Sequence, residues 1–303
     1  MGMGVAPVSS SQAGTAGDGG VPRRSRALVL GGGGVVGIAW EIGVLTGLAD
    51  EGVDLSNADV IIGTSAGATV AAQLTSGVAL SELFARQLLP PEQSGEARIR
   101  IERAAIVEFF TSAARGATSP AAARAAIGAA SVAAPTMDEA QRRAVIERRL
   151  PRPSWPDQCV RIVAVDATSG DVAVFDHTSG VELVDAIAAS TAVPGVFPPA
   201  TVHGRRYIDG GIRSVTNADL AGEHDAVVVV SPFVVGRLPF VEASVTAAIA
   251  ALLARPSTVA IGADEAALAA MGTNSLDPAN RAPSARAGRA QGRAAAVAVA
   301  AVW

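Results

Sequence analysis

Ser65 is the middle residue of a pentapeptide with the G-x-S-x-G spacing of a serine nucleophile. Residues 58–62 before it favour a short buried strand, and residues 66–74 after it favour a helix. A serine on such a strand-to-helix turn has strained backbone and presents its hydroxyl at a helix N-terminus. The alternative is a chance match in a chain with 32 glycines. The residues expected to form the elbow around Ser65 are Gly63, Thr64, Ala66 and Gly67.

A second glycine cluster, at residues 31–37, follows a predicted strand at residues 26–30 and precedes a predicted helix. Glycines at this position bring backbone N–H groups to the positive end of the helix dipole, which makes an anion site. Such a site suits a phosphate or the oxyanion of a tetrahedral acyl intermediate. The backbone amides expected to line an oxyanion hole are those of Gly32, Gly33 and Gly34.

The same cluster also fits the dinucleotide pattern G-x-G-x-x-G, through Gly32, Gly34 and Gly37. That pattern requires an acidic residue at the end of the next strand to hold the ribose. Asp54 instead falls before the next predicted strand, and that strand ends at the serine turn. The spacing therefore disfavours nucleotide binding, which stays open only as an alternative.

Asp209 precedes Gly210 and Gly211, and this triplet predicts a sharp turn after a short apolar strand. An Asp-Gly pair is often only a hairpin turn, but a chain with a serine nucleophile also needs a general base. An exposed aspartate is a weak base, so this role predicts a desolvated Asp209 with a raised pKa.

The three histidines, His177, His203 and His224, offer no clear alternative base. His224 follows Asp209 in the order of a Ser-acid-His triad. However, it precedes the strand predicted at residues 226–230, whereas sites in open parallel sheets lie at the carboxyl ends of strands. The sequence therefore favours Asp209.

Together, the glycine loop, the serine elbow and the Asp-Gly turn resemble the motifs of the patatin-like phospholipase family. The block Ala-Ser-Thr-Ala-Val-Pro from residue 189 resembles a fourth family motif, and the similarity covers about residues 25–235. The resemblance implies a three-layer α/β/α fold with a mostly parallel central sheet. It also implies a serine lipid acyl hydrolase with a Ser65–Asp209 dyad and neither cofactor nor metal. Val36 stands where many members have Arg or Lys, so no cation is expected from that position.

The chain divides by composition into a disordered leader at residues 1–24, a catalytic domain at 25–282 and a C-terminal helix at 283–303. Within the domain, residues 77–153 predict a helical insertion over the active site, in which residues 114–134 are expected to pack loosely. The arginines at positions 142, 143, 148, 149 and 152 are expected to form a solvated helix face rather than a lipid-docking patch. Downstream, the pattern predicts strands at 160–165, 172–175, 206–208 and 226–230, and helices at 183–190, 241–253 and 257–271.

Composition limits the function classes. A net charge of −4 argues against nucleic acid as a partner. All 24 basic residues are arginine, which with the abundant alanine and glycine suggests a GC-rich bacterial genome. Cys159 is the only cysteine, so no internal disulfide forms, and no Cys/His cluster has metal-ligand spacing. No signal peptide or membrane span is evident. These features predict a cytoplasmic enzyme that visits lipid surfaces.

Three functions remain compatible with the sequence. The first is hydrolysis of a phospholipid or related lipid ester. The second is a non-catalytic or nucleotide-binding protein on the same fold. The third is acyl transfer, because the acyl-enzyme is shared and only the acceptor differs. Head-group preference and oligomeric state are not encoded in any pattern that we recognise.

Overall fold

The computed structural model describes residues 23–96, 98–101, 103–234 and 240–303. Its strands form one eight-stranded sheet in the order β5-β6-β3-β2-β1-β7-β8, with β4 paired to β3. The strands are β1 (Arg26–Leu30), β2 (Val60–Thr64), β3 (Val160–Asp166), β4 (Val172–Phe175), β5 (Ala200–Val202), β6 (Arg205–Asp209), β7 (Ala226–Val230) and β8 (Thr258–Ile261). The helices are α1 (Gly34–Asp50), α2 (Ala66–Leu74), α3 (Leu80–Gln87), α4 (Arg103–Ala113), α5 (Pro120–Ala133), α6 (Glu139–Arg149), α7 (Leu183–Ser190), α8 (Ala243–Leu253), α9 (Glu265–Met271) and α10 (Arg281–Ala300).

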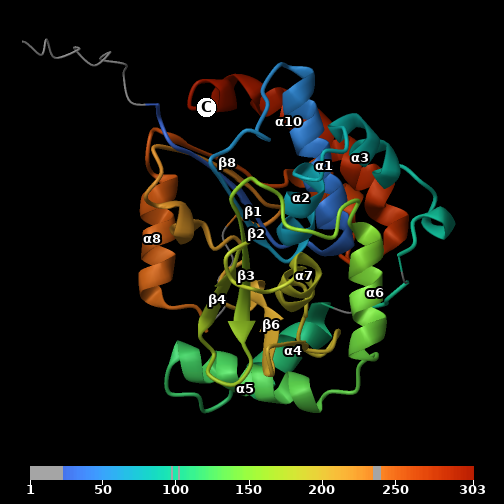
Figure 1. Ribbon diagram of the computed structural model, residues 1–303, viewed down its shortest axis with the longest axis vertical. Coiled ribbons are helices and arrows are strands. Elements are labelled where there is room, and N and C mark those ends of the chain that lie inside the picture. The colour runs from blue at the N-terminus through green and yellow to red at the C-terminus, as the bar shows by residue number, and fades with distance from the viewer. Residues whose placement is uncertain (1–22, 97, 102, 235–239) are drawn as a thin grey trace, which may run out of the picture.

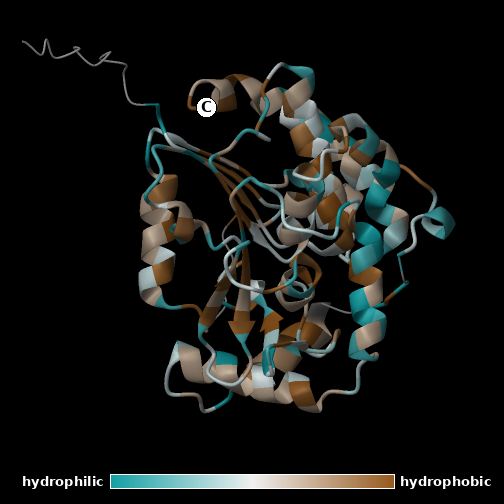
Figure 2. Ribbon diagram, viewed as in Figure 1, coloured by the Kyte–Doolittle hydropathy of each residue, from teal (hydrophilic) through white to brown (hydrophobic). Residues whose placement is uncertain are grey.

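The fold is the predicted three-layer α/β/α arrangement. Alternate residues of each central strand face opposite sides of the sheet. Leu28 and Leu30 of β1 belong to the core shared with α1, α2, α7 and α10, whereas Ala27 and Val29 pack toward α8. In Figure 1, α8 lies on one side of the sheet and the other four helices on the opposite side. Figure 2 shows apolar residues concentrated in the strands between them.

Strand register brings the three sequence motifs to one place. β3, β2, β1, β7 and β8 are parallel neighbours, and Leu30 pairs with Gly63, so the loops that follow β1 and β2 emerge side by side. β6 runs antiparallel to β3, with Asp209 opposite Ala164. Thr64, the residue before Ser65, pairs with Val163 on the other edge of β3. Asp209 therefore lies one strand away from the serine elbow.

Within the helical insertion, α4 and α5 lie at one end of the molecule, where they pack beneath β3 and β6 (Figure 1), whereas α3 packs against α1 and α10 and α6 against α7. The expectation of loose packing at residues 114–134 is wrong. Ser119 caps the N-terminus of α5 by accepting a hydrogen bond from the Ala122 N–H. Ile127 is fully buried in a cluster with Val165 and Phe240. A few apolar residues in an alanine-rich helix are thus enough to fix it on the core.

The single helix predicted for residues 257–271 is also wrong, because this segment contains β8 and α9. Val259 pairs with Val228 of β7, so β8 extends the parallel sheet at its edge. Local residues separate the strand from the helix. Gly262 follows β8, and Asp264 caps α9 by accepting a hydrogen bond from the Ala267 N–H. β5, which the sequence did not predict, pairs antiparallel with β6. The predictions for β1, β4, β7, α2 and α7 agree with the structure at both ends.

α10 packs lengthwise on α1. Glycines allow the two backbones to approach closely. A Cβ on Gly292 would lie 2.2 Å from the Val44 carbonyl oxygen, and one on Gly47 would lie 2.1 Å from that of Arg289. Arg289 and Arg293 of α10 both bond to Asp50 at the end of α1. The domain boundary at 282/283 stays a prediction, and the leader falls almost wholly outside the described residues.

Among the described residues, no helix combines the length and apolar character needed to cross a membrane.

The α1–α10 contact gives a stability prediction. We expect Gly292→Leu to lower the free energy of unfolding by about 3 kcal/mol, at the upper end of overpacking costs, because the side chain would force the two helices apart. Ala294→Leu adds the same side chain at an exposed position of α10 and is expected to change stability by less than about 0.5 kcal/mol. Urea unfolding of both variants measures the difference, and equal effects would contradict close backbone packing.

Candidate active site

Ser65 lies on a sharp elbow between β2 and α2. Its φ of 54° falls in the left-handed region that non-glycine residues rarely adopt. The neighbours must be small, because a Cβ on Gly67 would lie 2.1 Å from the Leu30 carbonyl oxygen and one on Gly63 would lie 2.6 Å from the Ala68 Cα. The Gly67 N–H also donates to the Gly31 carbonyl, which ties the elbow to the glycine loop. The strained turn therefore points the serine away from the sheet at the start of α2.

The Ser65 hydroxyl donates a hydrogen bond of 2.7 Å to Asp209 Oδ2. The other carboxylate oxygen, Oδ1, accepts a 2.7 Å hydrogen bond from the Gly211 N–H. Ser65 is 8% exposed and Asp209 is 5% exposed. The fold thus brings together a nucleophile-type hydroxyl and a buried carboxylate that lie 144 residues apart in the chain.

The pKa of Asp209 is raised to about 6, and burial of the carboxylate is the main cause. The hydrogen bonds from Ser65 and Gly211 and the charge of Arg142 act in the opposite direction, since each favours the ionised form. The raised pKa agrees with the direction expected from the sequence. At neutral pH the carboxylate is ionised yet basic enough to accept a proton from a bound hydroxyl.

The end of α7 and the turn that follows it hold the backbones of both Ser65 and Asp209. The Ser65 N–H donates to Ser190 Oγ at 2.9 Å, and the Ser190 hydroxyl donates to the Val163 carbonyl at 2.6 Å. Two residues later, the Ala192 carbonyl accepts from the Asp209 N–H at 3.0 Å. Both lie in the block at residues 189–199 that the sequence singled out without assigning roles. Its contribution is to set the spacing between the hydroxyl and the carboxylate.

Asn217 is a further positioning residue that sequence reasoning missed. It is fully buried, and its amide nitrogen donates to Thr64 Oγ1 and to the Gly210 carbonyl, at 3.1 and 3.2 Å. One side chain therefore joins the serine elbow to the Asp-Gly turn. Its left-handed backbone, with φ of 49°, suits asparagine, but no pattern in the sequence linked it to either motif.

The glycine loop lies directly beside the serine, since a Cβ on Gly32 would lie 3.7 Å from the Ser65 Cβ. The Gly32 N–H, however, donates to the Val215 carbonyl at 2.9 Å. This bond occupies one of the three amides expected to line an oxyanion hole. Within the described part of the chain, the amides of Gly33 and Gly34 have no acceptor. These two groups, at the N-terminus of α1, remain available to an anion.

Glu41 of α1 bonds to the backbone of the glycine loop. Its Oε1 accepts a 3.1 Å hydrogen bond from the Gly31 N–H, and its Oε2 is buried without a partner. Complete burial raises the pKa of Glu41 well above its usual value. Val36, at the position where many family members have Arg or Lys, is also buried in the core.

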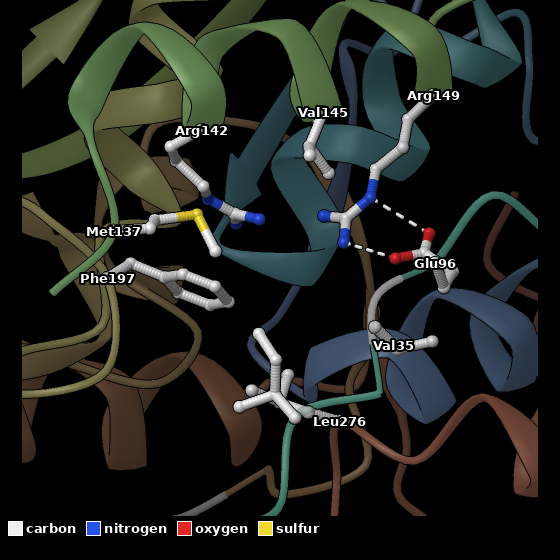
Figure 3. A pocket seen from close by; sticks show the side chains of 9 residues that line it. Val35, Glu96, Met137, Arg142, Val145, Arg149, Phe197 and Leu276 are labelled. Atoms are coloured by element: carbon white, nitrogen blue, oxygen red, sulfur yellow. Dashed lines mark hydrogen bonds and ion pairs between the residues drawn. The ribbon is translucent and has the colours of Figure 1, made fainter.

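A pocket lined mainly by apolar side chains opens onto Ser65. Val193, Phe197 and Leu276 form part of its wall, and Arg142 and Arg149 enter it from α6. Within the predicted insertion, α6 therefore forms part of the wall of the site. The prediction of a solvated face is wrong for Arg142, which is 4% exposed. It is also wrong for Arg149, which pairs with Glu96 (Figure 3).

The histidines lie away from this pocket. His177 and His203 are exposed, and His224 precedes β7, at the amino end of the parallel strands, with its ring against the Ala221 carbonyl. No group of His, Cys, Asp or Glu suited to a metal ion occurs in the described part of the chain.

A family model described as patatin-like phospholipase matches residues 28–221, which include the glycine loop, Ser65 and Asp209. This chain belongs to the patatin-like phospholipase family. Among solved structures, it is similar to VipD from Legionella pneumophila, with 14% identity and a TM-score of 0.44 over 90% of this chain and 66% of that one. It is also similar to the type III effector protein ExoU, with 18% identity and a TM-score of 0.36 over 90% and 54%. A search of curated proteins finds no match.

This member of the patatin-like family thus spans just under two thirds of VipD and about half of ExoU.

The buried Glu41 gives a pH-dependent stability prediction. Because its pKa is raised in the folded state, its contribution to stability is greatest below about pH 4.5 and is lost as the pH rises. Glu41→Gln keeps an acceptor for the Gly31 N–H but does not titrate. We therefore expect it to become more stable than the wild type by up to about 1.4 kcal/mol for each pH unit above that value, until the folded-state pKa is reached. Urea unfolding at about pH 5 and pH 8 measures this, and a pH-independent difference would contradict it.

Proposed function

We propose that this protein is a serine lipid acyl hydrolase of phospholipase A or lysophospholipase type, which cleaves a carboxylic ester through a Ser65–Asp209 dyad. The observation that carries the proposal is the 2.7 Å hydrogen bond from the Ser65 hydroxyl to a buried carboxylate. Membership of the patatin-like phospholipase family supports the same chemistry. No histidine lies near the serine in the described residues, so Asp209 is the group available to act as base.

In the first half-reaction, Ser65 Oγ attacks the ester carbonyl and Asp209 Oδ2 accepts the hydroxyl proton. The carbonyl oxygen becomes negative as the tetrahedral intermediate forms. We assign its stabilisation to the amides of Gly33 and Gly34, which have no other acceptor and point from the N-terminal end of α1. When the intermediate collapses, Asp209 gives this proton to the leaving oxygen, the alcohol departs, and the acyl group stays on Ser65 while the Asp209 carboxylate is ionised again.

In the second half-reaction, Asp209 takes a proton from water, which attacks the acyl-enzyme and releases the fatty acid. Neither step requires a cofactor or metal. Replacement of water by an alcohol acceptor would give acyl transfer through the same intermediate. Product analysis with and without added glycerol separates the two outcomes, because transfer would yield a new ester in place of free acid.

The pocket suits an acyl chain because Val193, Phe197 and Leu276 line it next to the serine. Ser65 is nevertheless 8% exposed, and α6 forms the wall above it. A lipid must therefore displace part of that wall as it enters. We propose that this happens during peripheral contact with a lipid surface by a cytoplasmic enzyme.

Substitution of the dyad tests the proposal. We expect Ser65→Ala and Asp209→Asn each to lower the hydrolysis of p-nitrophenyl acyl esters by at least about 10³-fold, because the nucleophile or its base is lost. Asp157→Asn changes an exposed aspartate and serves as the matched control. Release of p-nitrophenol by variants that retain wild-type circular dichroism measures the effect. Full activity in Asp209→Asn would exclude the dyad.

The raised pKa of Asp209 predicts the pH profile. Only the ionised carboxylate accepts the serine proton, so kcat/KM is expected to fall about tenfold for each pH unit below about 6 and to level off above it. Initial rates between about pH 4 and pH 9 on a non-titrating ester provide the measurement. A profile that stays flat down to pH 4 would mean that Asp209 is not the base.

A further inference from the structure

Arg142 is a buried cation without a direct ion pair beside the proposed nucleophile. The residue is 4% exposed, and among the described residues Glu96 and Asp209 act on its guanidinium through their charges and not through a direct ion pair. Nη2 donates to Thr191 Oγ1 in a long hydrogen bond of 3.3 Å, and Nε is buried with no hydrogen-bond partner. Burial of a charge is costly unless it is paired. The site therefore holds unused donors at a cost in stability.

The neighbouring arginine shows the contrast. Arg149 lies two turns further along α6 and enters the same pocket. However, its Nε and Nη2 both donate hydrogen bonds to the Glu96 carboxylate. In Figure 3, two dashed lines join Arg149 to Glu96, and none of the residues drawn pairs with Arg142. Glu96 thus bonds directly to one arginine, whereas the other interacts with Glu96 and Asp209 only through their charges and keeps a buried Nε without a hydrogen-bond partner.

Packing fixes the direction of the Arg142 guanidinium. Its Cζ lies 3.6 Å from the centre of the Phe197 ring, a stacked arrangement that holds the planar group in place. Burial lowers the pKa of Arg142 to about 9, so the group stays protonated at neutral pH. Arg142 lines the same pocket as Ser65 and Gly34, the start of α1. A positioned guanidinium of this kind matches the paired oxygens of a phosphate.

We propose that Arg142 is a specificity-determining residue that binds the phosphate diester of a phospholipid substrate while Ser65 attacks the neighbouring acyl ester. This inference rests on the proposed function and narrows its substrate to esters that carry a phosphate close to the scissile bond. The ligand supplies the acceptor that the Arg142 donors lack. Binding energy is then gained from the phosphate group and not only from the acyl chain.

A matched substrate pair tests the assignment. Palmitoyl lysophosphatidylcholine and monopalmitoylglycerol share the acyl chain and the glycerol ester and differ in the phosphocholine group. We expect Arg142→Gln to lower kcat/KM on the lysophospholipid by about tenfold to hundredfold, the value of a hydrogen bond to a charged group. Its kcat/KM on the monoacylglycerol should change less than about threefold. Arg142→Lys, which keeps the charge but not the planar fork, should restore part of the loss.

The assay pH and a control variant separate phosphate binding from an indirect effect on the base and from a general effect of charge on α6. Arg142 also lowers the pKa of Asp209, so rates are compared at about pH 8, where the base is ionised in every variant. Arg148→Gln is the control: Arg148 is an exposed arginine of the same helix, and it does not line the serine pocket. This variant should leave both rates unchanged. An equal loss on both substrates in Arg142→Gln would show a purely structural role and overturn the proposal, as would no loss on the lysophospholipid.

A binding measurement separates this inference from the hydrolase proposal. Ether analogues of the two lipids, with an alkyl chain in place of the acyl chain, cannot be cleaved. Calorimetry should show that the wild type binds the phosphate-bearing ether more tightly than the neutral one and that Arg142→Gln loses this preference. If the preference persists in Arg142→Gln, the inference fails even if the enzyme is active. If no ester is hydrolysed but the preference depends on Arg142, only the hydrolase proposal fails. Displacement of the ether by inorganic phosphate at equal concentration would identify free phosphate, and not a lipid, as the ligand.

Discussion

The hydrogen bond between the Ser65 hydroxyl and the Asp209 carboxylate is the interaction on which the rest of the structure depends. It joins the residue after β2 to the last residue of β6, on either side of β3, and it is buried. Burial has two consequences. It raises the pKa of Asp209 enough to make an aspartate useful as a base, and it requires protein groups rather than water to bond to the backbone of the pair. Ser190 at the end of α7, the Ala192 carbonyl and the side chain of Asn217 make such bonds.

Close approach of backbones is the second constraint, and glycine satisfies it. Gly67 lets α2 start against the end of β1, and Gly47 and Gly292 let α1 and α10 pack in direct contact. α1 carries at its N-terminus the two amides that we assign to the oxyanion. The position of these amides relative to Ser65 therefore depends on packing along the whole length of α1, and not only on the glycine loop.

Local patterns allowed the sequence to predict most of this frame. The elbow, the glycine loop and the Asp-Gly turn each occupy a few consecutive residues, and apolar runs marked β1 and β7. The failures have physical reasons. β8 was read as helix because its alternation is short and its stability comes from pairing with β7. The packing of α5 was predicted to be loose because its many alanines obscure the apolar face of the helix, which a few larger residues such as Ile127 fix on the core.

The contacts that sequence reasoning missed act over long distances. Ser190 reaches a backbone 125 residues away and Asn217 a hydroxyl 153 residues away. The Gly32 amide is taken by Val215, and Arg142 lies inside the protein although its helix reads as a charged surface. Such contacts exist only once the chain has folded, so no pattern of neighbouring residues signals them.

The most direct test of the central claim is to locate the adduct formed with a fluorophosphonate, which reacts with activated serines, by mass spectrometry of the digested protein. We expect a single modified peptide that contains Ser65. We also expect labelling to slow strongly in Asp209→Asn and to fall with protonation of Asp209 below about pH 6. Modification of another serine, or labelling of Ser65 at an undiminished rate in Asp209→Asn, would contradict the proposed dyad.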